Sequence, residues 1–239
     1  MNFSFALLLC SVIFLYSCAS SPANEPVKPI SKQDEINNNI TALKKNAVSG
    51  DLIVRLTDDL ISEQIKFLNE KEKIYSHAGI IIIKNNQSFV CNISPNDPEN
   101  DTIQIVPLDS FINPAKNLKC ALYRFDLSQE EKDSLNEILL KYKSDDVRFD
   151  RLYDLNTDNK MYCAELIDKA LQKATRNRIN IRRTNIPAAM QPTVFAFFKK
   201  ENVTKKMVLQ RKIITVDNLY LRNDCKKIMS FPLKYFPGS

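Results

Sequence analysis

Two residues of the chain have the chemistry for cysteine-dependent hydrolysis, Cys163 and His77. Such hydrolysis needs a thiolate, a base that takes and returns its proton, and a polar group that orients the base. Cys163 lies in the first turn of a helix predicted over Met161–Lys173, where unpaired backbone N–H groups and the helix dipole favour a thiolate and lower the thiol pKa. The backbone N–H of Cys163 could also donate to an oxyanion.

His77 is the only histidine among the 239 residues, so a histidine base can only be this one. A single histidine, taken alone, more often has a purely structural role. The neighbouring residues Ala78 and Gly79 are small, however, and leave room for another element to approach the imidazole. This context favours the catalytic interpretation.

A β-hairpin is predicted around His77. Residues Ile74–Ile83 are apolar and β-branched, and a polar turn at Asn85-Asn86 separates them from a second strand over Ser88–Ile93. If Asn85-Asn86 is a two-residue turn, the numbers of paired residues sum to 171. His77 then lies near the end of the hairpin that is distant from the turn.

This register predicts the residue that orients His77. Ser94 is directly opposite His77, and Asn92 is its diagonal neighbour on the same face of the sheet. The Asn92 side-chain oxygen can accept from one imidazole nitrogen and leave the other for the sulfur of Cys163. We therefore predict that Asn92 is the third catalytic residue, with Ser94 in that role if the register differs. The alternative is that Asn92 merely ends a strand.

Two residues beside Cys163 are candidates for the pocket or the oxyanion site. Tyr162 precedes the cysteine and either lines the oxyanion pocket or packs in the core. Glu165 lies in the same helical turn and either complements the helix N-terminus or bonds within the core. For Asp51 and Asp150 we expect structural hydrogen bonds in a turn and a loop.

The order of elements indicates an α+β fold with one domain, a mostly antiparallel sheet with helices to one side. The capping box Ser128-Gln129-Glu130-Glu131 opens a predicted helix that runs to about Tyr142. Other predicted helices begin near Ile36, near Asp58 and at Val216. Further strands are expected over 52–55, 102–106, 118–125 and 207–214.

The N-terminal segment resembles the signal of a bacterial lipoprotein. Residues 3–17 are apolar and uncharged, which is too short a run for a membrane-spanning helix. The run ends at Cys18, where a lipoprotein signal would be cleaved and the cysteine acylated. We therefore divide the chain into a signal peptide (1–17), a lipidated flexible tether (18–35) and a hydrolase domain (36–239). A plain signal peptide with an incidental cysteine is the alternative.

Charge and cysteine content limit the partners. The formal net charge is +6, which suits contact with anionic phospholipid or cell-wall polymer, while scattered basic residues on an exported chain do not suggest nucleic acid. The cysteine spacings fit no metal motif, so no metal and no cofactor are expected. Four cysteines remain after Cys10 and Cys18, and any disulfides among Cys91, Cys120 and Cys225 stay open.

Four segments in order resemble the permuted papain-like hydrolases of the YiiX/YaeF type, relatives of the NlpC cell-wall peptidases. They are Gly50–Ile53, Ser76–Ile80, Phe149–Asp154 and Tyr162–Leu166. The segment Ile214–Leu219 resembles the closing part of that family. The likeness implies a circularly permuted papain-like fold, in which the histidine strands precede the cysteine helix.

In that family the residues matching His77 and Cys163 are catalytic, and Asn92 falls where a polar orienting residue, often a carboxylate, is found. Some members are lipoproteins, in line with Cys18. The leading hypothesis is an outer-membrane lipoprotein, facing the periplasm, that cleaves an amide or ester bond of a cell-wall peptide or acyl lipid through an acyl-cysteine. The alternatives are a catalytically silent lipoprotein that binds lipid or polymer in the same cleft, and a disulfide-stabilised structural lipoprotein.

Overall fold

The computed structural model describes residues 31–95, 101–199 and 203–235. The predicted signal peptide, Cys18 and the tether as far as residue 30 lie outside the described residues. From Lys32 onward the chain forms one compact unit. None of the helices among the described residues is both long and apolar enough to cross a lipid bilayer.

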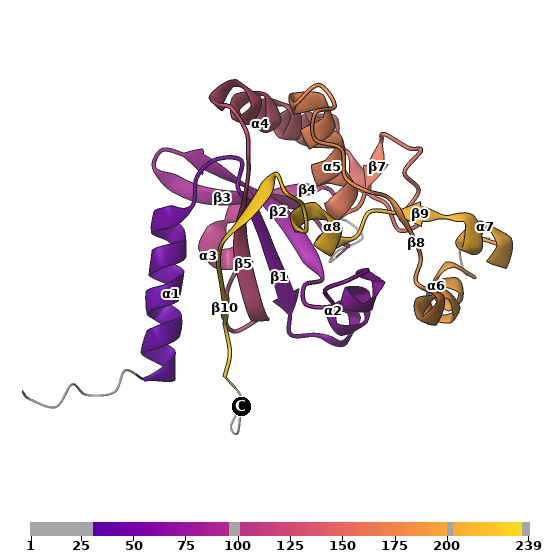
Figure 1. The fold of residues 1–239 in the computed structure, drawn as a ribbon, viewed down its shortest axis with the longest axis horizontal. Helices are drawn as coiled ribbons and strands as arrows, with labels where there is room; N and C mark the ends of the chain where they lie inside the picture. Colours follow the sequence, from indigo (N-terminus) through magenta and orange to yellow (C-terminus); the bar gives the residue numbers. More distant parts are fainter. Residues whose placement is uncertain (1–30, 96–100, 200–202, 236–239) are drawn as a thin grey trace, which may run out of the picture. The chain divides into compact units, whose positions relative to one another are not determined.

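A six-stranded antiparallel sheet forms the centre of this unit (Figure 1), with the strand order β10-β5-β1-β2-β3-β4. Its strands are β1 (Leu52–Thr57), β2 (His77–Lys84), β3 (Gln87–Ile93), β4 (Ile103–Pro107), β5 (Asn117–Phe125) and β10 (Cys225–Pro232). Short two-residue strands form two further pairs. They are β6 (Arg148–Phe149) with β7 (Lys160–Met161), and β8 (Thr184–Asn185) with β9 (Lys212–Ile213).

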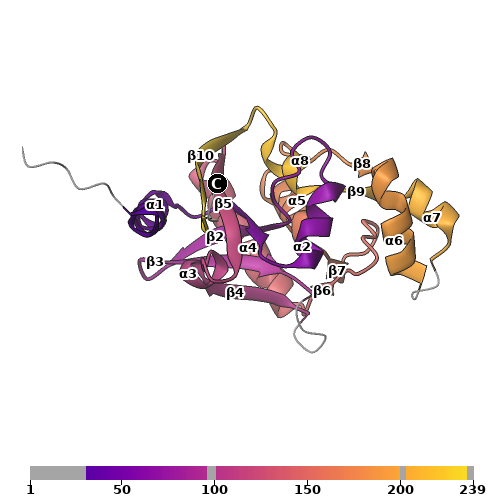
Figure 2. The ribbon, with the colours of Figure 1, turned by 90° about the horizontal axis from the view of Figure 1, so that it is seen from below.

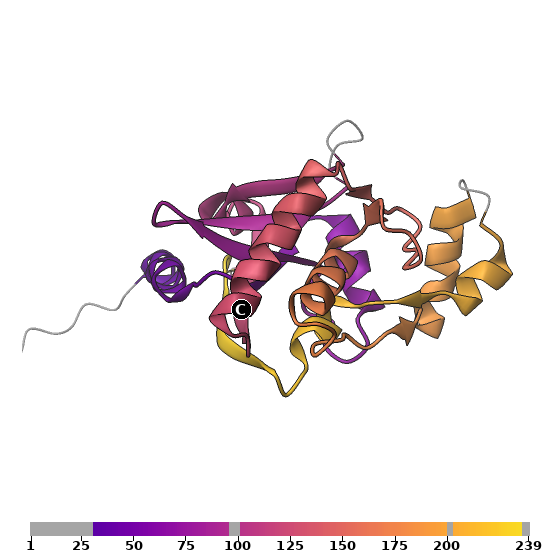
Figure 3. The same cartoon turned by 90° about the horizontal axis from the view of Figure 1, so that it is seen from above.

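Helices cover both faces of the sheet. On one face pack α4 (Gln129–Ser144) and α5 (Cys163–Ala174), which lie side by side over the strands in Figure 3. On the other face pack α1 (Lys32–Asn46) and the short α3 (Leu108–Phe111). Alternate residues of each strand point to opposite faces, so one sheet supplies both hydrophobic cores. The predicted antiparallel α+β class is confirmed, but the expectation that helices lie on one side is wrong.

Helix starts follow local capping chemistry. The predicted capping box of α4 is present, because Ser128 Oγ accepts from the Glu131 N–H and Glu131 Oε2 accepts from the Ser128 N–H. Asp59 caps α2 (Leu60–Ile65), which continues as a 3₁₀ helix, η1 (Lys66–Leu68). Helix α1 begins at Lys32, within the range predicted as tether, and has acidic residues in its first turn that favour helix formation there.

A third, smaller group of buried residues lies at the end of the unit that carries α6 (Gln191–Phe198) and α7 (Lys205–Gln210), beside β8 and β9 (Figure 2). The 3₁₀ helix η2 (Ala188–Met190) leads into α6, and α8 (Val216–Tyr220) follows β9. The predicted strand over 207–214 is wrong except at Lys212–Ile213, because residues 205–210 form α7 with Thr204 as its cap. The helix predicted from Val216 is confirmed.

Candidate active site

The β2–β3 hairpin has the predicted register. Asn85 and Asn86 both have positive φ, 51° and 58°, as the two central residues of a type I′ turn require. Ile80 pairs with Cys91 and Lys84 pairs with Gln87, so the numbers of paired residues sum to 171. The two-residue turn thereby decides which residues of β3 share a face with His77.

The predicted hydrogen bond between His77 and Asn92 is present. Nε2 of His77 lies 3.1 Å from Oδ1 of Asn92, and both side chains are buried. Because Oδ1 can only accept, Nε2 carries the proton in this pair, and Nδ1 is left as the basic nitrogen of the neutral ring. Asn92 thus holds the imidazole in one orientation and one tautomer.

Gly79 permits the close approach of the two strands at this point. A Cβ on Gly79 would lie 2.4 Å from Cγ1 of Val90 and 2.9 Å from the carbonyl oxygen of Cys91. Both distances are shorter than van der Waals contact, so any larger residue would push β3 away. The glycine therefore helps to bring Asn92 within reach of His77.

Cys163 is the first residue of α5, with Tyr162 as the N-cap, so the predicted position of the thiol at a helix N-terminus is confirmed. Cys163 and His77 line the same small cavity, together with Ser76, Tyr153 and Tyr162 among others. We call this space the dyad cavity; its volume is about 60 Å³. The fold therefore brings the predicted nucleophile and base to one place, although they are far apart in the sequence.

Burial has the largest effect on the pKa values of Cys163 and His77. It raises the pKa of Cys163 to about 11, although the backbone N–H groups of Ala78, Ala164 and Cys163 and the charge of Arg55 act in the opposite direction. Burial lowers the pKa of His77 to about 3; Arg55 adds to this effect and the bond to Asn92 opposes it. The expectation of a depressed cysteine pKa is wrong for this state, because a helix N-terminus alone does not offset complete desolvation. At neutral pH the pair consists of a thiol and a neutral imidazole.

Arg55 is a site residue that the sequence analysis did not identify. It is the partner of His77 in the pairing of β1 with β2. Its guanidinium lies 4.1 Å from the centroid of the Phe111 ring and donates to the Phe111 carbonyl oxygen, while Nε is buried without a partner. Burial lowers the pKa of Arg55 to about 10, and the Cys163 thiolate opposes that shift. The sequence feature that could have indicated Arg55 is an arginine within an otherwise apolar strand.

Tyr153 belongs to one of the family-like motifs, but the sequence analysis assigned it no role. It lies between β6 and β7, where its φ of 53° is in the left-handed region that bulky residues rarely adopt. Its ring packs on that of Tyr162, with centroids 4.5 Å apart. Its hydroxyl has no hydrogen-bond partner among the described residues, and burial and then the nearby Cys163 raise its pKa. Tyr153 therefore has an unengaged O–H group and lines the same cavity as Cys163.

Tyr162 lines the dyad cavity, but its hydroxyl is already engaged. It accepts from the N–H of Ile214 at 2.6 Å and lies 3.1 Å from the Ile214 carbonyl oxygen, to which it donates. This leaves it no free proton for an oxyanion. Of the two roles left open by the sequence, the structure therefore favours packing, with the hydroxyl joining α5 to the segment before α8.

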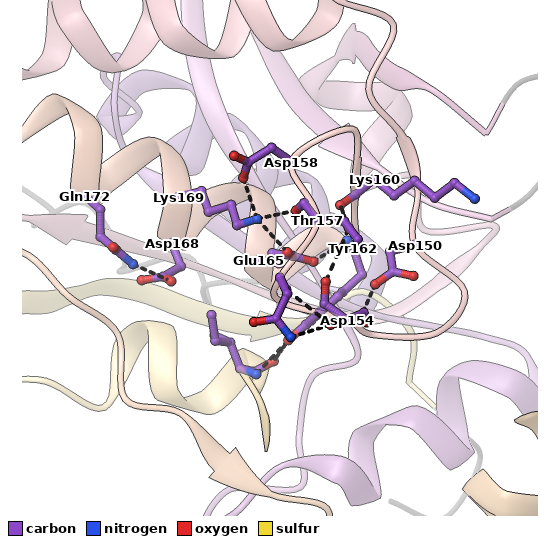
Figure 4. A network of polar contacts seen from close by, with 12 residues as sticks. Asp150, Asp154, Thr157, Asp158, Lys160, Tyr162, Glu165, Asp168, Lys169 and Gln172 are labelled. Atoms are coloured by element: carbon purple, nitrogen blue, oxygen red, sulfur yellow. Dashed lines mark hydrogen bonds and ion pairs between the residues drawn. The ribbon is translucent and has the colours of Figure 1, made fainter. Parts of the chain in front are cut away.

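Glu165 does not line the dyad cavity, so its prediction as a pocket residue is wrong, whereas the expectation that it bonds at the helix N-terminus is confirmed. Its carboxylate turns back along α5, accepting from the Tyr162 N–H and lying 3.1 Å from Nζ of Lys169 (Figure 4). Lys169 also bonds Asp158 and the Thr157 carbonyl oxygen. Burial raises the pKa of Glu165 to about 8. Glu165 therefore links the loop before α5 to the helix. From the third helical position, its side chain reaches the N-cap residue more easily than it reaches the sulfur of Cys163.

Asp51 and Asp150 have the structural roles that we expected. Asp51 pairs with Arg124 and accepts from the Val48 N–H. Asp150 accepts from the backbone N–H groups of Leu152 and Asp154.

All four cysteines of the described residues, Cys91, Cys120, Cys163 and Cys225, are free thiols. This does not support the hypothesis of a disulfide-stabilised structural protein. Burial raises the pKa of each of the three other than Cys163 to about 12. These three buried thiols are the reference against which the reactivity of Cys163 can be compared.

A cysteine at a helix N-terminus that lines one cavity with a histidine of an antiparallel sheet, the histidine being hydrogen-bonded to an amide, is the arrangement of the papain-like class of cysteine hydrolases. Residues 46–221 match the family described as "permuted papain-like amidase enzyme, YaeF/YiiX, C92 family". This match covers more than half of the chain, which therefore belongs to that family.

A solved structure has the same fold. It is described as the metalloprotein YiiX from Escherichia coli O157:H7, with a TM-score of 0.60 and 20% sequence identity over 79% of this chain and 98% of that chain. A comparison with curated proteins gave no match. The permuted papain-like fold follows from both the family and the structural likeness, and the family implies hydrolase activity.

Proposed function

We propose that this chain is a thiol hydrolase that cleaves an amide or ester bond through an acyl-cysteine intermediate at Cys163. The observation that carries the proposal is geometric. Cys163, at the N-terminus of α5, and His77, held by Asn92, line one cavity. This is the arrangement in which a base can take a proton from a thiol and return it to a leaving group.

The first half-reaction forms the acyl-enzyme. Because the resting pair is neutral, Nδ1 of His77 accepts the thiol proton as Sγ of Cys163 attacks the substrate carbonyl carbon. The carbonyl oxygen becomes an oxyanion, for which the backbone N–H of Cys163 and the hydroxyl of Tyr153 are donors. The bond to the leaving amine or alcohol then breaks, and His77 gives its proton to that group.

The second half-reaction releases the product. His77 takes a proton from a water molecule as the water oxygen attacks the thioester carbon. The bond between carbon and sulfur breaks, Sγ receives the proton back from His77, and a carboxylic acid leaves. Arg55 favours the thiolate during both steps, since its charge lowers the pKa of Cys163.

No step of the proposal uses a metal ion. Among the described residues there is no group of three or more His, Cys, Asp or Glu side chains placed to hold one. The reactive groups in the dyad cavity are one thiol and one imidazole that is hydrogen-bonded to an amide, and these are the groups that a thiol hydrolase uses.

We also propose that the enzyme is anchored in the cell envelope through a lipidated Cys18, facing the periplasm from the outer membrane. Support comes from the uncharged apolar run before Cys18 and from the residue that follows it. That residue is Ala19, and not the aspartate that is associated with inner-membrane retention. Cys18→Ala should move the protein from the membrane fraction to the soluble fraction. A variant that stays in membranes with its signal uncleaved would contradict the anchor without bearing on the active site.

The test of the catalytic proposal is labelling of the native protein with a neutral alkylating probe such as iodoacetamide, followed by identification of the modified cysteine by mass spectrometry. Cys163 should take the probe first, and Cys163→Ala should lose both labelling and turnover. Cys225→Ala is the matched control and should keep both. Faster labelling of Cys91, Cys120 or Cys225 than of Cys163 would refute the assignment. Labelling of Cys163 without turnover of any ester or amide would favour the silent binding protein.

A further inference from the structure

Some polar side chains that line the dyad cavity are already engaged within the protein. Asn69 donates to the Tyr75 carbonyl oxygen and accepts from the N–H groups of the first two residues of α8. The hydroxyl of Tyr162 is bonded to Ile214, and that of Thr215 donates to Oδ1 of Asp217. These groups cannot turn towards a substrate without losing a hydrogen bond that the fold provides.

The Ser76 hydroxyl, by contrast, is free. Ser76 lines the dyad cavity and is only 5% exposed, and its Oγ is buried without a hydrogen-bond partner among the described residues. Within the described part of the chain, no other buried and unpartnered side-chain N or O atom belongs to a residue of this cavity. A buried hydroxyl without a partner costs free energy. Its place in a reaction cavity indicates that a reacting group supplies the partner.

The backbone on both sides of Ser76 is fixed. The Ser76 N–H donates to the Arg55 carbonyl oxygen at 3.0 Å, which continues the pairing of β1 with β2 by one residue. The preceding carbonyl oxygen, that of Tyr75, accepts from Nδ2 of Asn69 at 2.8 Å. The hydroxyl is therefore presented from a preorganised position, one residue before the base His77.

The reaction leaves two protons that need a hydrogen-bond acceptor. The oxyanion has two donors, the Cys163 N–H and the Tyr153 hydroxyl, and Nδ1 of His77 takes one proton of the attacking water. The second proton of that water must point elsewhere, and so must the N–H that a departing amine keeps from its amide. A serine hydroxyl has two lone pairs that can accept either of them. An unpaired N–H or O–H in a desolvated cavity would be costly.

We propose that Ser76 is a further catalytic residue, whose Oγ accepts from the second proton of the hydrolytic water and, in the first half-reaction, from the N–H of the departing amine. This inference rests on the proposed thiol hydrolase function. The dyad cavity, at about 60 Å³, admits water, which needs about 10 to 15 Å³. Ser76 therefore favours water over acceptors that have only one O–H proton.

The serine itself neither gains nor loses a proton. The water oxygen bonds to the thioester carbon while one water proton passes to Nδ1 of His77. The other proton stays on the new hydroxyl group of the product, hydrogen-bonded to Ser76 Oγ. The bond between carbon and sulfur then breaks with its electron pair on Sγ of Cys163, which takes the proton from His77.

Methanol tests this role because it has one O–H proton where water has two. Cys163 acylated by p-nitrophenyl acetate can pass the acetyl group to either, and the ratio of methyl acetate to acetate reports only on the second half-reaction. In Ser76→Ala, hydrolysis should slow by about tenfold, the effect of about one lost hydrogen bond, while methanolysis stays within about twofold. The product ratio should rise accordingly. Cys163→Ala measures the uncatalysed background.

Ser230→Ala is the matched control. The Ser230 hydroxyl, on β10, shares a hydrogen bond of 2.9 Å with the hydroxyl of Tyr75, the residue before Ser76, but Ser230 does not line the dyad cavity. This variant should lose stability in urea melts and keep the wild-type product ratio. Ser76→Ala should show the reverse, because its hydroxyl has no partner in the described protein to lose.

The outcomes separate this role from the hydrolase proposal. A wild-type product ratio in Ser76→Ala would overturn the role of Ser76 and leave the hydrolase standing. Equal slowing of hydrolysis and methanolysis would make Ser76 a structural residue. Faster methanolysis with unchanged hydrolysis would show only that alanine makes room for the methyl group, and would also overturn the role. If the wild type forms no product that depends on Cys163, the hydrolase proposal fails and this inference fails with it.

Discussion

Replacing Asn92 with aspartate would put a negative charge beside the buried imidazole of His77. The asparagine oxygen is 3.1 Å from Nε2, so an aspartate there would lie within ion-pair distance of an imidazolium. Two unit charges 4 Å apart attract by about 4 kcal/mol at an effective dielectric constant of about 20. At about 1.4 kcal/mol per pKa unit, this raises the pKa of His77 by about three. From its value of about 3 in the present structure, the pKa of His77 should therefore reach about 6.

The assay is simple because the chain has one histidine. In protein made without a histidine tag, the ring proton chemical shifts of His77 report its titration by NMR. The wild-type shifts should be constant from pH 5 to pH 9, whereas Asn92→Asp should give an inflection near pH 6. Asn92→Ala removes the hydrogen bond without adding a charge and should keep the pKa of His77 low. Arg55→Met removes a neighbouring cation and should raise the pKa by less than Asn92→Asp does, since burial is the larger cause.

Two results would refute this reasoning. Titration of wild-type His77 between pH 6 and pH 7 would mean that burial does not control its charge. Equal pKa values for His77 in Asn92→Asp and Asn92→Ala would mean that the added charge does not change the pKa of the imidazole. The second result would also weaken the conclusion that Asn92 sets the tautomer.

Three further predictions concern the same site. Gly79→Ala should lower the free energy of unfolding by about 1 to 3 kcal/mol in urea melts, because its Cβ would lie 2.4 Å from Val90 Cγ1; an unchanged value would show that the strands can separate freely. Tyr153→Phe should lower kcat by about 100-fold with little change in KM or in thermal stability, since the hydroxyl has no partner to lose; unchanged kcat would remove it from the oxyanion site. The pKa of His77 is lower in the folded than in the unfolded state, so protonation of this residue below pH 6.5 favours the unfolded state. The free energy of unfolding should therefore fall by about 1.4 kcal/mol for each pH unit from pH 6.5 towards pH 3. Urea melts at pH 6 and pH 4 should show this loss in the wild type and a smaller one in His77→Gln; parallel losses would contradict it.

Local chemistry is readable from the sequence where the interacting residues are close in the chain. The Asn85-Asn86 turn, the register of β2 with β3 and the His77–Asn92 hydrogen bond all follow from one two-residue turn and the alternation of side chains along a strand. The capping box of α4 and the position of Cys163 at the start of α5 depend on a few adjacent residues. The physical cause of each of these features lies in residues that are close together in the chain, so none of them depends on a distant segment.

Other features had no local signal. Strand β10 was not predicted, because its Lys-rich sequence shows little burial pattern and its pairing with β5 joins segments about a hundred residues apart. Residues 207–214 alternate like a strand, but Thr204 caps a helix there. Helices on both faces of the sheet could not be inferred, since strand alternation does not show which covering element meets which face.

The residue types at the active site, the class of reaction and the geometry of the histidine hairpin were therefore open to inference from the chain alone. The charge states and the surroundings of the dyad were not. The pKa values of Cys163 and His77 depend on desolvation and on Arg55, and both arise only when β1, β2 and α5 pack together. A larger cavity of about 520 Å³, lined mostly by apolar residues, adjoins the dyad cavity, and its walls come from α2, the β6–β7 segment and α6, which are distant in sequence. Burial and cavity shape are properties of packed surfaces, so they exist only in the folded molecule.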